Sequence, residues 1–313
     1  MNCFECKFES YLSLSIYNDN TTTTTTTTRS LKNMERVALE EKKVRSQRSP
    51  LLEHYKLKTK TLKGLRREHL VPSALKMLNL KDKEIDLTKL LDVKCEYPGV
   101  YSFDLFRPGV CKDLISEINQ FLTFRNEIEK AKGPIPGTLR ERLVLKDMLL
   151  GPFSNELFQK IVVPLSKQLF DKHVSDLDFE HSYFVGYAPT ETPAKNLIRN
   201  ALIPHSDDSE ITLNLCLSKD YTGGELHFHG ALSKADFRAS PKIDYTYKHQ
   251  LGRCVLHLGK MIHSVSSVTK GERHVLIMWC RSIRNQRAIQ CPCCREFNRK
   301  ECVCVPELFG GAY

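Results

Sequence analysis

The most restrictive feature of this sequence is a change of periodicity near residue 181. In RPGVCKDLISEINQFL, residues such as Leu114, Ile118 and Phe121 recur at helical spacing. Beyond residue 181 the chain instead runs in short alternating or β-branched segments separated by turn residues. Helices followed by a run of strands predict an α+β fold, with the helices on one side of a sandwich or barrel.

Individual elements can be predicted from the same patterns. HSYFVGYAP predicts one strand, and EITLNLCLS predicts another with one buried face. The Gly223–Gly224 pair and the turn TKGE each predict a hairpin. Pro164 should kink or divide the helix predicted for NELFQKIVVPLSKQLF.

Charge is concentrated near the N-terminus. The net charge is +10, and 13 Lys or Arg against 4 Glu lie between Arg29 and Arg67. The other residues carry 34 basic and 33 acidic side chains, a balance of +1. This basic segment is either a solvated surface or a contact for an acidic partner or nucleic acid.

Composition divides the chain into four parts. Residues 1–34, with the threonine tract, are predicted to be a disordered tail. Residues 35–100 form a basic, partly helical arm, residues 101–283 the folded domain, and residues 284–313 a cysteine-rich tail. No apolar run approaches the ~18 residues that a bilayer requires, and the N-terminus lacks a basic region typical of a signal peptide. We expect a soluble intracellular protein, cytoplasmic or nuclear.

The 12 cysteines fall into two groups. Five are scattered through apolar segments, as reduced core cysteines usually are. The others gather at the ends of the chain, and their CxC spacing differs from the paired CxxC of common zinc sites. Structural zinc and reduced thiols are therefore both open for the C-terminal cluster. The terminal cysteines are Cys3, Cys6, Cys291, Cys293, Cys294, Cys302 and Cys304.

A candidate metal site begins at IPHSDDSEITLNLCL. His205 and Asp207 lie two apart, and residues at this spacing on an extended chain point the same way. A non-haem Fe(II) centre takes two histidines and one carboxylate and leaves positions open for other ligands. Asp208 should point away from Asp207 and is the weaker candidate.

The third metal ligand has to come from a neighbouring strand. His263 is the best placed candidate, since it follows Gly259 at the predicted mouth of a hairpin. Arg273 follows ten residues later, on the predicted returning strand, and a guanidinium suits a carboxylate. The other candidates for the third ligand are His227, His229, His257 and His274.

The sequence resembles the 2-oxoglutarate- and iron-dependent oxygenases, in their prolyl 4-hydroxylase-like branch. The resemblance is carried by HSD, TGGELHF, GRCVLHLGKMIH and GERHVLIMWCRS, and extends over roughly residues 100–296. It implies a double-stranded β-helix, a distorted jelly roll. It also implies iron ligands at His205, Asp207 and His263, with the cosubstrate 2-oxoglutarate held by Arg273 and contacted by Tyr187. The segment from Pro189 to Pro204 is longer than expected for this branch, beside the predicted site.

The resemblance implies a dioxygenase that uses Fe(II), 2-oxoglutarate and O₂, with ascorbate as reductant. Such an enzyme hydroxylates a protein side chain or small molecule and releases succinate and CO₂. The sequence does not identify the substrate. The alternative is a catalytically inactive binding module that uses the basic arm and the cysteine-rich tail.

Overall fold

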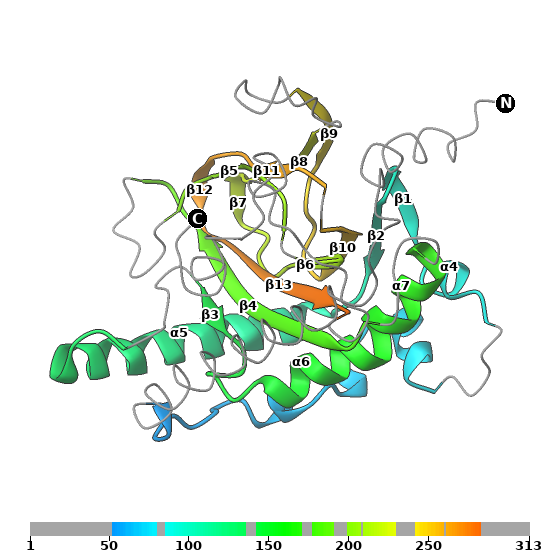
Figure 1. Cartoon of the computed structure of the whole chain (residues 1–313). Helices are drawn as coiled ribbons and strands as arrows, with labels where there is room; N and C mark the ends of the chain where they lie inside the picture. The colour runs from blue at the N-terminus through cyan, green and yellow to red at the C-terminus, as the bar shows by residue number, and fades with distance from the viewer. Residues whose placement is uncertain are drawn as a thin grey trace, which may run out of the picture.

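The computed structural model describes residues 52–79, 85–135, 142–170, 177–190, 199–207, 209–229, 242–259 and 261–282 (Figure 1). The N-terminal tail, the cysteine-rich C-terminal tail and Asp208 lie outside the described residues, so the predictions made for them stay predictions. Within the described ranges, no helix combines the length and apolar composition needed to cross a bilayer.

The helices precede the long strands, as the periodicity predicts. The longest of those described is α5 (Pro108–Lys132), which begins at a proline, a residue that suits the first turn of a helix, and is followed by Gly133, whose φ is 82°. Pro164 lies in the first turn of α7, directly after a π-helical turn between α6 and α7, and helical residues run without a break from Gly151 to Phe170. The other helical segments are η1 (Lys60–Lys63), η2 (Arg67–His69), α3 (Pro72–Leu75), η3 (Lys76–Asn79), α4 (Leu87–Leu90), α6 (Gly151–Leu157), η4 (Phe158–Val162) and α7 (Val163–Phe170).

The strands form antiparallel sheets, which confirms the α+β class. We call the seven-stranded sheet, with order β1-β2-β10-β6-β13-β4-β3, the major sheet, and the four-stranded sheet, with order β5-β11-β8-β9, the minor sheet. Strands β7 and β12 form a separate pair. The strands are β1 (Lys94–Tyr97), β2 (Val100–Asp104), β3 (Leu143–Val144), β4 (Phe179–Tyr187), β5 (Leu202–His205), β6 (Ile211–Cys216), β7 (Tyr221–Gly223), β8 (Leu226–His229), β9 (Ile243–Tyr247), β10 (Arg253–Leu258), β11 (His263–Val265), β12 (Val268–Gly271) and β13 (Arg273–Arg281).

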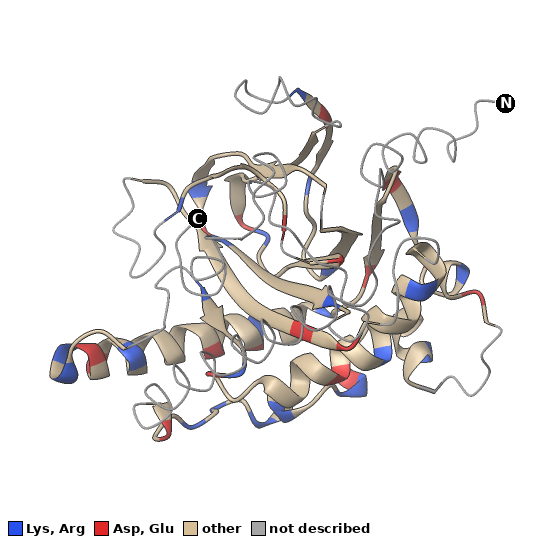
Figure 2. Ribbon diagram, in the orientation of Figure 1, with Lys and Arg blue, Asp and Glu red and all other residues tan. Residues whose placement is uncertain are grey.

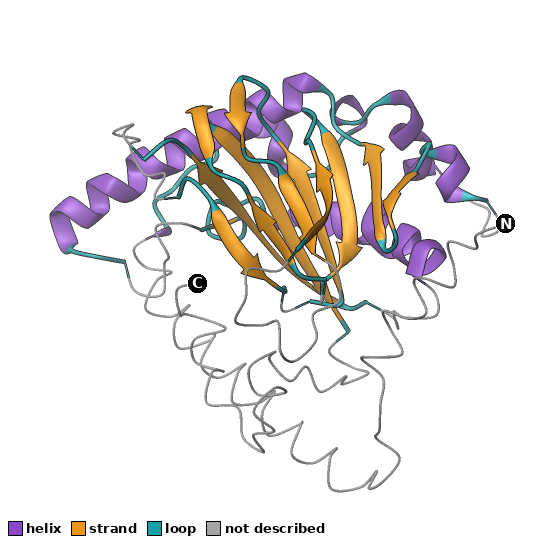
Figure 3. Cartoon of the chain, turned by 90° about the horizontal axis from the view of Figure 1, so that it is seen from above, coloured by secondary structure: helices purple, strands orange, loops and turns teal. Residues whose placement is uncertain are grey.

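Both faces of the major sheet are covered. Helices gather on one side of the strands (Figure 3), and the larger hydrophobic core lies between them and the sheet. A second core contains residues from strands of both sheets, such as Val185 and Val275 from the major and Leu226 and Phe228 from the minor sheet. The prediction that EITLNLCLS has only one buried face is therefore wrong. All residues of β6 are buried, because its alternate side chains point between the sheets.

The two predicted hairpins are also wrong. Strands β7 and β8 flank Gly223–Gly224 but do not pair with each other, since β7 pairs with β12 and β8 with β9 and β11. The TKGE segment largely belongs to β12, and β13 pairs with β4 and β6. His263 and Arg273 consequently lie in different sheets, not in adjacent strands. The turns exist, but each carries the chain from one sheet to another.

The segment from Leu52 to Leu70 lies against the larger core. Leu52, Tyr55, Leu62 and Leu65 are buried in it, whereas the basic residues between them are exposed. Figure 2 shows such charges along the helices and the N-terminal segment, with few on the strands of the major sheet. The predicted arm thus contributes residues to the core of the folded body. The boundary predicted at residue 101 stays a prediction.

A buried carboxylate on α5 holds this N-terminal segment. Glu117 is fully buried and accepts hydrogen bonds from the Tyr55 hydroxyl and from the backbone N–H groups of Lys58 (3.1 Å) and Thr59 (3.0 Å). The Tyr55 ring also contacts Phe121, with centroids 4.9 Å apart. A buried carboxylate is tolerated only when its oxygens are hydrogen-bonded, so these three donors make the position of Glu117 acceptable.

We expect Glu117→Gln to destabilise the folded chain by about 1.5–3 kcal/mol, because a neutral amide weakens the bonds and its NH₂ group faces backbone donors. Urea denaturation followed by circular dichroism measures the change. The matched control is Glu127→Gln on the exposed face of the same helix, which should stay within roughly 0.5 kcal/mol. Equal stability of the Glu117→Gln and control variants would show that the segment is held by its apolar contacts alone.

Candidate functional site

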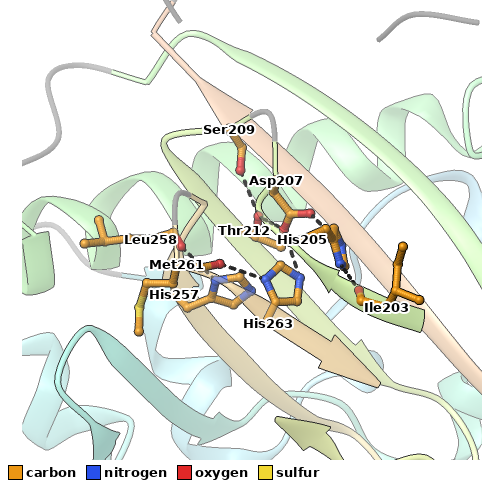
Figure 4. Close-up of polar contacts among 9 residues, drawn as sticks. All are labelled: Ile203, His205, Asp207, Ser209, Thr212, His257, Leu258, Met261 and His263. Atoms are coloured by element: carbon orange, nitrogen blue, oxygen red, sulfur yellow. Dashed lines mark hydrogen bonds and ion pairs between the residues drawn. The ribbon is translucent and has the colours of Figure 1, made fainter. Parts of the chain in front are cut away.

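Three of the predicted site residues come together between the two sheets. His205 ends β5, His263 begins β11, and the two residues lie directly opposite each other in the antiparallel pairing of these strands. Their ring centroids are 4.3 Å apart. One nitrogen of each histidine and one oxygen of Asp207 all lie within 4.8 Å of one another (Figure 4). The chain thus collects two imidazoles from two strands of the minor sheet and a carboxylate from the segment that follows β5.

Asp207 is fixed by its neighbours. Its backbone N–H donates to the Gly259 carbonyl (2.7 Å), and the Thr212 hydroxyl donates to Oδ2 (2.6 Å). A Cβ at Gly259 would lie 2.1 Å from the Ser209 carbonyl oxygen, so only glycine permits this approach. The two carboxylate oxygens each face one histidine, at 3.6 Å from Nε2 of His205 and 3.6 Å from Nε2 of His263.

In both rings Nδ1 faces a backbone carbonyl and Nε2 faces the Asp207 carboxylate. Nδ1 of His205 lies 2.9 Å from the Ile203 carbonyl, and Nδ1 of His263 lies 2.9 Å from the Met261 carbonyl. A carbonyl can only accept a hydrogen bond, so each Nδ1 carries the proton and each Nε2 offers a lone pair. Hydrogen bonds of this kind are what commonly orient metal-binding histidines. The donor set of two Nε2 atoms and a carboxylate therefore fits a divalent transition metal.

Burial sets the charges of the cluster. Burial alone would raise the pKa of Asp207, but the adjacent His263 and His205 hold it below its ordinary value. Burial lowers the pKa of His263 to about 3, against the opposing charge of Asp207. At neutral pH the group thus contains an ionised carboxylate and a neutral His263. The side chain of His205 remains 27% exposed, so the cluster is reachable from that side.

The other histidines considered from sequence are not members of this group. His257 lies beside it, with its ring centroid 4.8 Å from that of His263, and its Nδ1 bonds to the Leu258 carbonyl at 2.9 Å. It is not among the residues whose ligand atoms converge. His227 contacts Thr246, His229 contacts Ser264, and His274 faces Glu272.

Arg273 and Tyr187, the two residues predicted to contact the cosubstrate, lie side by side in the major sheet. Arg273 begins β13, is fully buried, and lies opposite Tyr187 of β4. Its guanidinium carbon is 5.0 Å from the Tyr187 ring centroid, and Nη2 donates to Nδ1 of His249 (2.8 Å). Nε and Nη1 are buried and have no hydrogen-bond partner within the described ranges. A buried cation with unpaired donors is costly, so this geometry suits a carboxylate ligand.

Three residues in contact with these groups are not predicted from the sequence. The sequence identifies Thr212 only as a strand residue, and His249 lies in a loop without any recognisable pattern. Gly224 was interpreted as a turn, but a Cβ there would lie 2.7 Å from Cδ of Arg273, so this glycine leaves space for the arginine. The TGGELHF motif could have pointed to Gly224, whereas nothing in the sequence singles out His249.

Comparisons with known proteins agree with the resemblance. The family model for the OGFOD2-like domain matches residues 51–175. One relative is the Arabidopsis thaliana 2-oxoglutarate and iron-dependent oxygenase domain-containing protein CP2. The two sequences are 32% identical over 216 residues, an alignment that covers 68% of this chain and 52% of the relative. The chain is 30% identical over 203 residues to the Xenopus tropicalis 2-oxoglutarate and iron-dependent oxygenase domain-containing protein 2, covering 62% and 52%.

Solved structures also match, at low identity. AviO1 from Streptomyces viridochromogenes aligns with a TM-score of 0.43 and 16% identity, covering 62% of this chain and 93% of that one. A prolyl 4-hydroxylase from Phytophthora capsici aligns with a TM-score of 0.41 and 18% identity, covering 70% and 68%. The chain spans about half the length of the curated relatives it matches. It therefore carries an OGFOD2-like domain and, over about two thirds of its length, is similar to the 2-oxoglutarate and iron-dependent oxygenases.

Proposed function

We propose that the protein is an Fe(II)- and 2-oxoglutarate-dependent dioxygenase that hydroxylates a protein side chain or a small molecule. The observation that carries this proposal is the convergence of His205, Asp207 and His263, with a buried arginine that has unpaired donors on the facing sheet. In this proposal those three residues hold the iron, and Arg273 and Tyr187 contact 2-oxoglutarate. O₂ is the second cosubstrate, and ascorbate would keep the iron reduced.

The fold proposed for this function is a double-stranded β-helix. Strands β4, β6, β10 and β13 belong to the major sheet, whereas β5, β8 and β11 belong to the minor sheet. The chain thus alternates repeatedly between two facing antiparallel sheets, which supports a jelly-roll arrangement. The alternation also explains why a ligand held between the sheets can be contacted from both of them.

The chain's own residues would bind, orient and shield the reactants. When bound, iron and 2-oxoglutarate supply the oxidising chemistry, in which decarboxylation yields succinate and CO₂. Thr212 and the Gly259 backbone hold the Asp207 carboxylate between the two imidazoles. Arg273, being excluded from water, would bind the distal carboxylate of 2-oxoglutarate more strongly than an exposed arginine does.

We expect His205→Ala, Asp207→Ala and His263→Ala each to abolish 2-oxoglutarate-dependent succinate release. Each removes one of three protein ligands, so Mn(II) affinity should fall by more than the roughly 10–100-fold of an outer-shell change. Titration with Mn(II), followed by electron paramagnetic resonance, measures this loss. His257→Ala is the control and should retain metal binding. If His257→Ala loses the metal and His263→Ala does not, the third ligand is misassigned.

We expect Arg273→Lys to weaken 2-oxoglutarate binding and Arg273→Ala to weaken it further, with Mn(II) affinity almost unchanged. Lysine keeps the charge but loses the planar fork, and alanine loses charge-assisted hydrogen bonds of about 1.5–3 kcal/mol each, tenfold or more in affinity. Isothermal titration of 2-oxoglutarate into the Mn(II)-loaded protein tests this. Equal affinities for wild type and Arg273→Ala would remove Arg273 from the site. Absence of binding to wild type would instead favour a catalytically inactive binding module.

A further inference from the structure

Arg273 donates a hydrogen bond to Nδ1 of His249, and it also acts on the Tyr221 hydroxyl of β7 by its charge and by a hydrogen bond. His249 lies in the loop between β9 and β10, outside the cluster around Asp207. Its ring meets that of Tyr247 edge-on, with centroids 5.2 Å apart, and its Nε2 atom is buried. If His249 were protonated, it and Arg273 would be two cations in contact and would repel each other strongly.

The direction of the hydrogen bond fixes the state of His249. A guanidinium can only donate, so Nδ1 of His249 accepts from Nη2 of Arg273 and the imidazole proton sits on Nε2. The ring is therefore neutral. Burial and the charge of Arg273 both favour the neutral ring, because together they hold the pKa of His249 well below its usual range.

Because His249 is neutral, it can accept a hydrogen bond from Arg273 without cancelling the charge of the guanidinium. Aspartate or glutamate in this place would pair with Arg273 and cancel its charge. Among the described residues, no carboxylate forms an ion pair with Arg273. The bond to His249 occupies Nη2 but leaves the full positive charge, together with the unpaired Nε and Nη1 groups. The guanidinium is held and still available to an anion.

Three neighbours together fix where that charge lies. The Tyr187 ring covers one side of the guanidinium at 5.0 Å, and Gly224 provides the space for its aliphatic part. His249 holds Nη2, and so sets the rotation of the group about its last bond. An arginine fixed in this manner loses little conformational entropy when a ligand binds, which favours affinity and selectivity.

We propose that His249 is a positioning residue for the cosubstrate: it orients Arg273 without neutralising it and so makes the site selective for a 2-oxo acid with a distal carboxylate. The inference rests on the proposed function and deepens it. It predicts that altering the charge or hydrogen bonding of residue 249 changes recognition of the distal carboxylate only.

The test compares two ligands and three variants of the full chain loaded with Mn(II). The ligands are 2-oxoglutarate and 2-oxopentanoate, which has the same carbon chain without the distal carboxylate. His249→Asp should weaken 2-oxoglutarate binding at least about tenfold, because its carboxylate pairs with Arg273. Binding of 2-oxopentanoate and of Mn(II) should stay unchanged. His249→Asn, whose Oδ1 is bonded to Cγ as Nδ1 is and can accept the same hydrogen bond, should stay within about threefold of wild type.

A matched control separates this effect from a general one. His227→Asp introduces the same charge on β8, where the native ring contacts Thr246 rather than Arg273, and should leave both affinities unchanged. The proposal is overturned if His249→Asp keeps the wild-type preference for 2-oxoglutarate. It is equally overturned if that variant weakens both ligands alike or lowers Mn(II) affinity, since His249 would then be only structural. Failure of wild type to bind 2-oxoglutarate would overturn the proposed function itself, and the inference with it.

Discussion

The pairing of β5 with β11 is the constraint on which the site depends, because it places His205 directly opposite His263. Residues opposite each other in an antiparallel pair project to the same side of the sheet, so both imidazoles necessarily face the same space. Asp207 then has to lie between them, and the Gly259 backbone holds it there. A slip of one residue in this register would send one histidine to the other face of the minor sheet and destroy the cluster.

Arg273 lies in the major sheet, and the packing of the surrounding fold has to offset the free energy lost when this cation is buried. Arg273 is fully buried, and such a cation is retained only where the surroundings hold it strongly. Here the covering layers are the helices on one face and the minor sheet on the other, which also bury every residue of β6. The hydrogen bond from Tyr55 to Glu117 attaches the N-terminal segment to α5 and so extends the layer that covers this face of the major sheet.

Local patterns predicted the residues of the site better than their arrangement. His-x-Asp spacing is a property of one extended segment, and the resemblance supplied His263, so the cluster around Asp207 could be anticipated. The spacing of ten residues between His263 and Arg273 suggested adjacent strands, but the chain crosses between sheets at β12, and alternating patterns cannot say which strand a turn leads to. Likewise, the single buried face predicted for EITLNLCLS is wrong at Thr212 and Asn214, because the polarity of a side chain does not reveal whether it is exposed or buried with polar partners. The role of His249 follows from its tertiary contact with Arg273, and no local sequence pattern predicts that contact.

The charges of the site fit one kind of ligand. Asp207 contributes one negative charge and Arg273 one positive charge, while His249 and His263 are neutral for the physical reasons given above. Histidines that bind a metal are also neutral. A divalent metal on the cluster would therefore give the site a total charge of about +2, buried between two sheets. A 2-oxo dicarboxylate carries two negative charges, one at each end, and would neutralise the metal at one end and Arg273 at the other. A monocarboxylate would leave the buried arginine without an anionic partner. Since an unpaired buried cation is unfavourable, such a ligand would bind more weakly than the dicarboxylate.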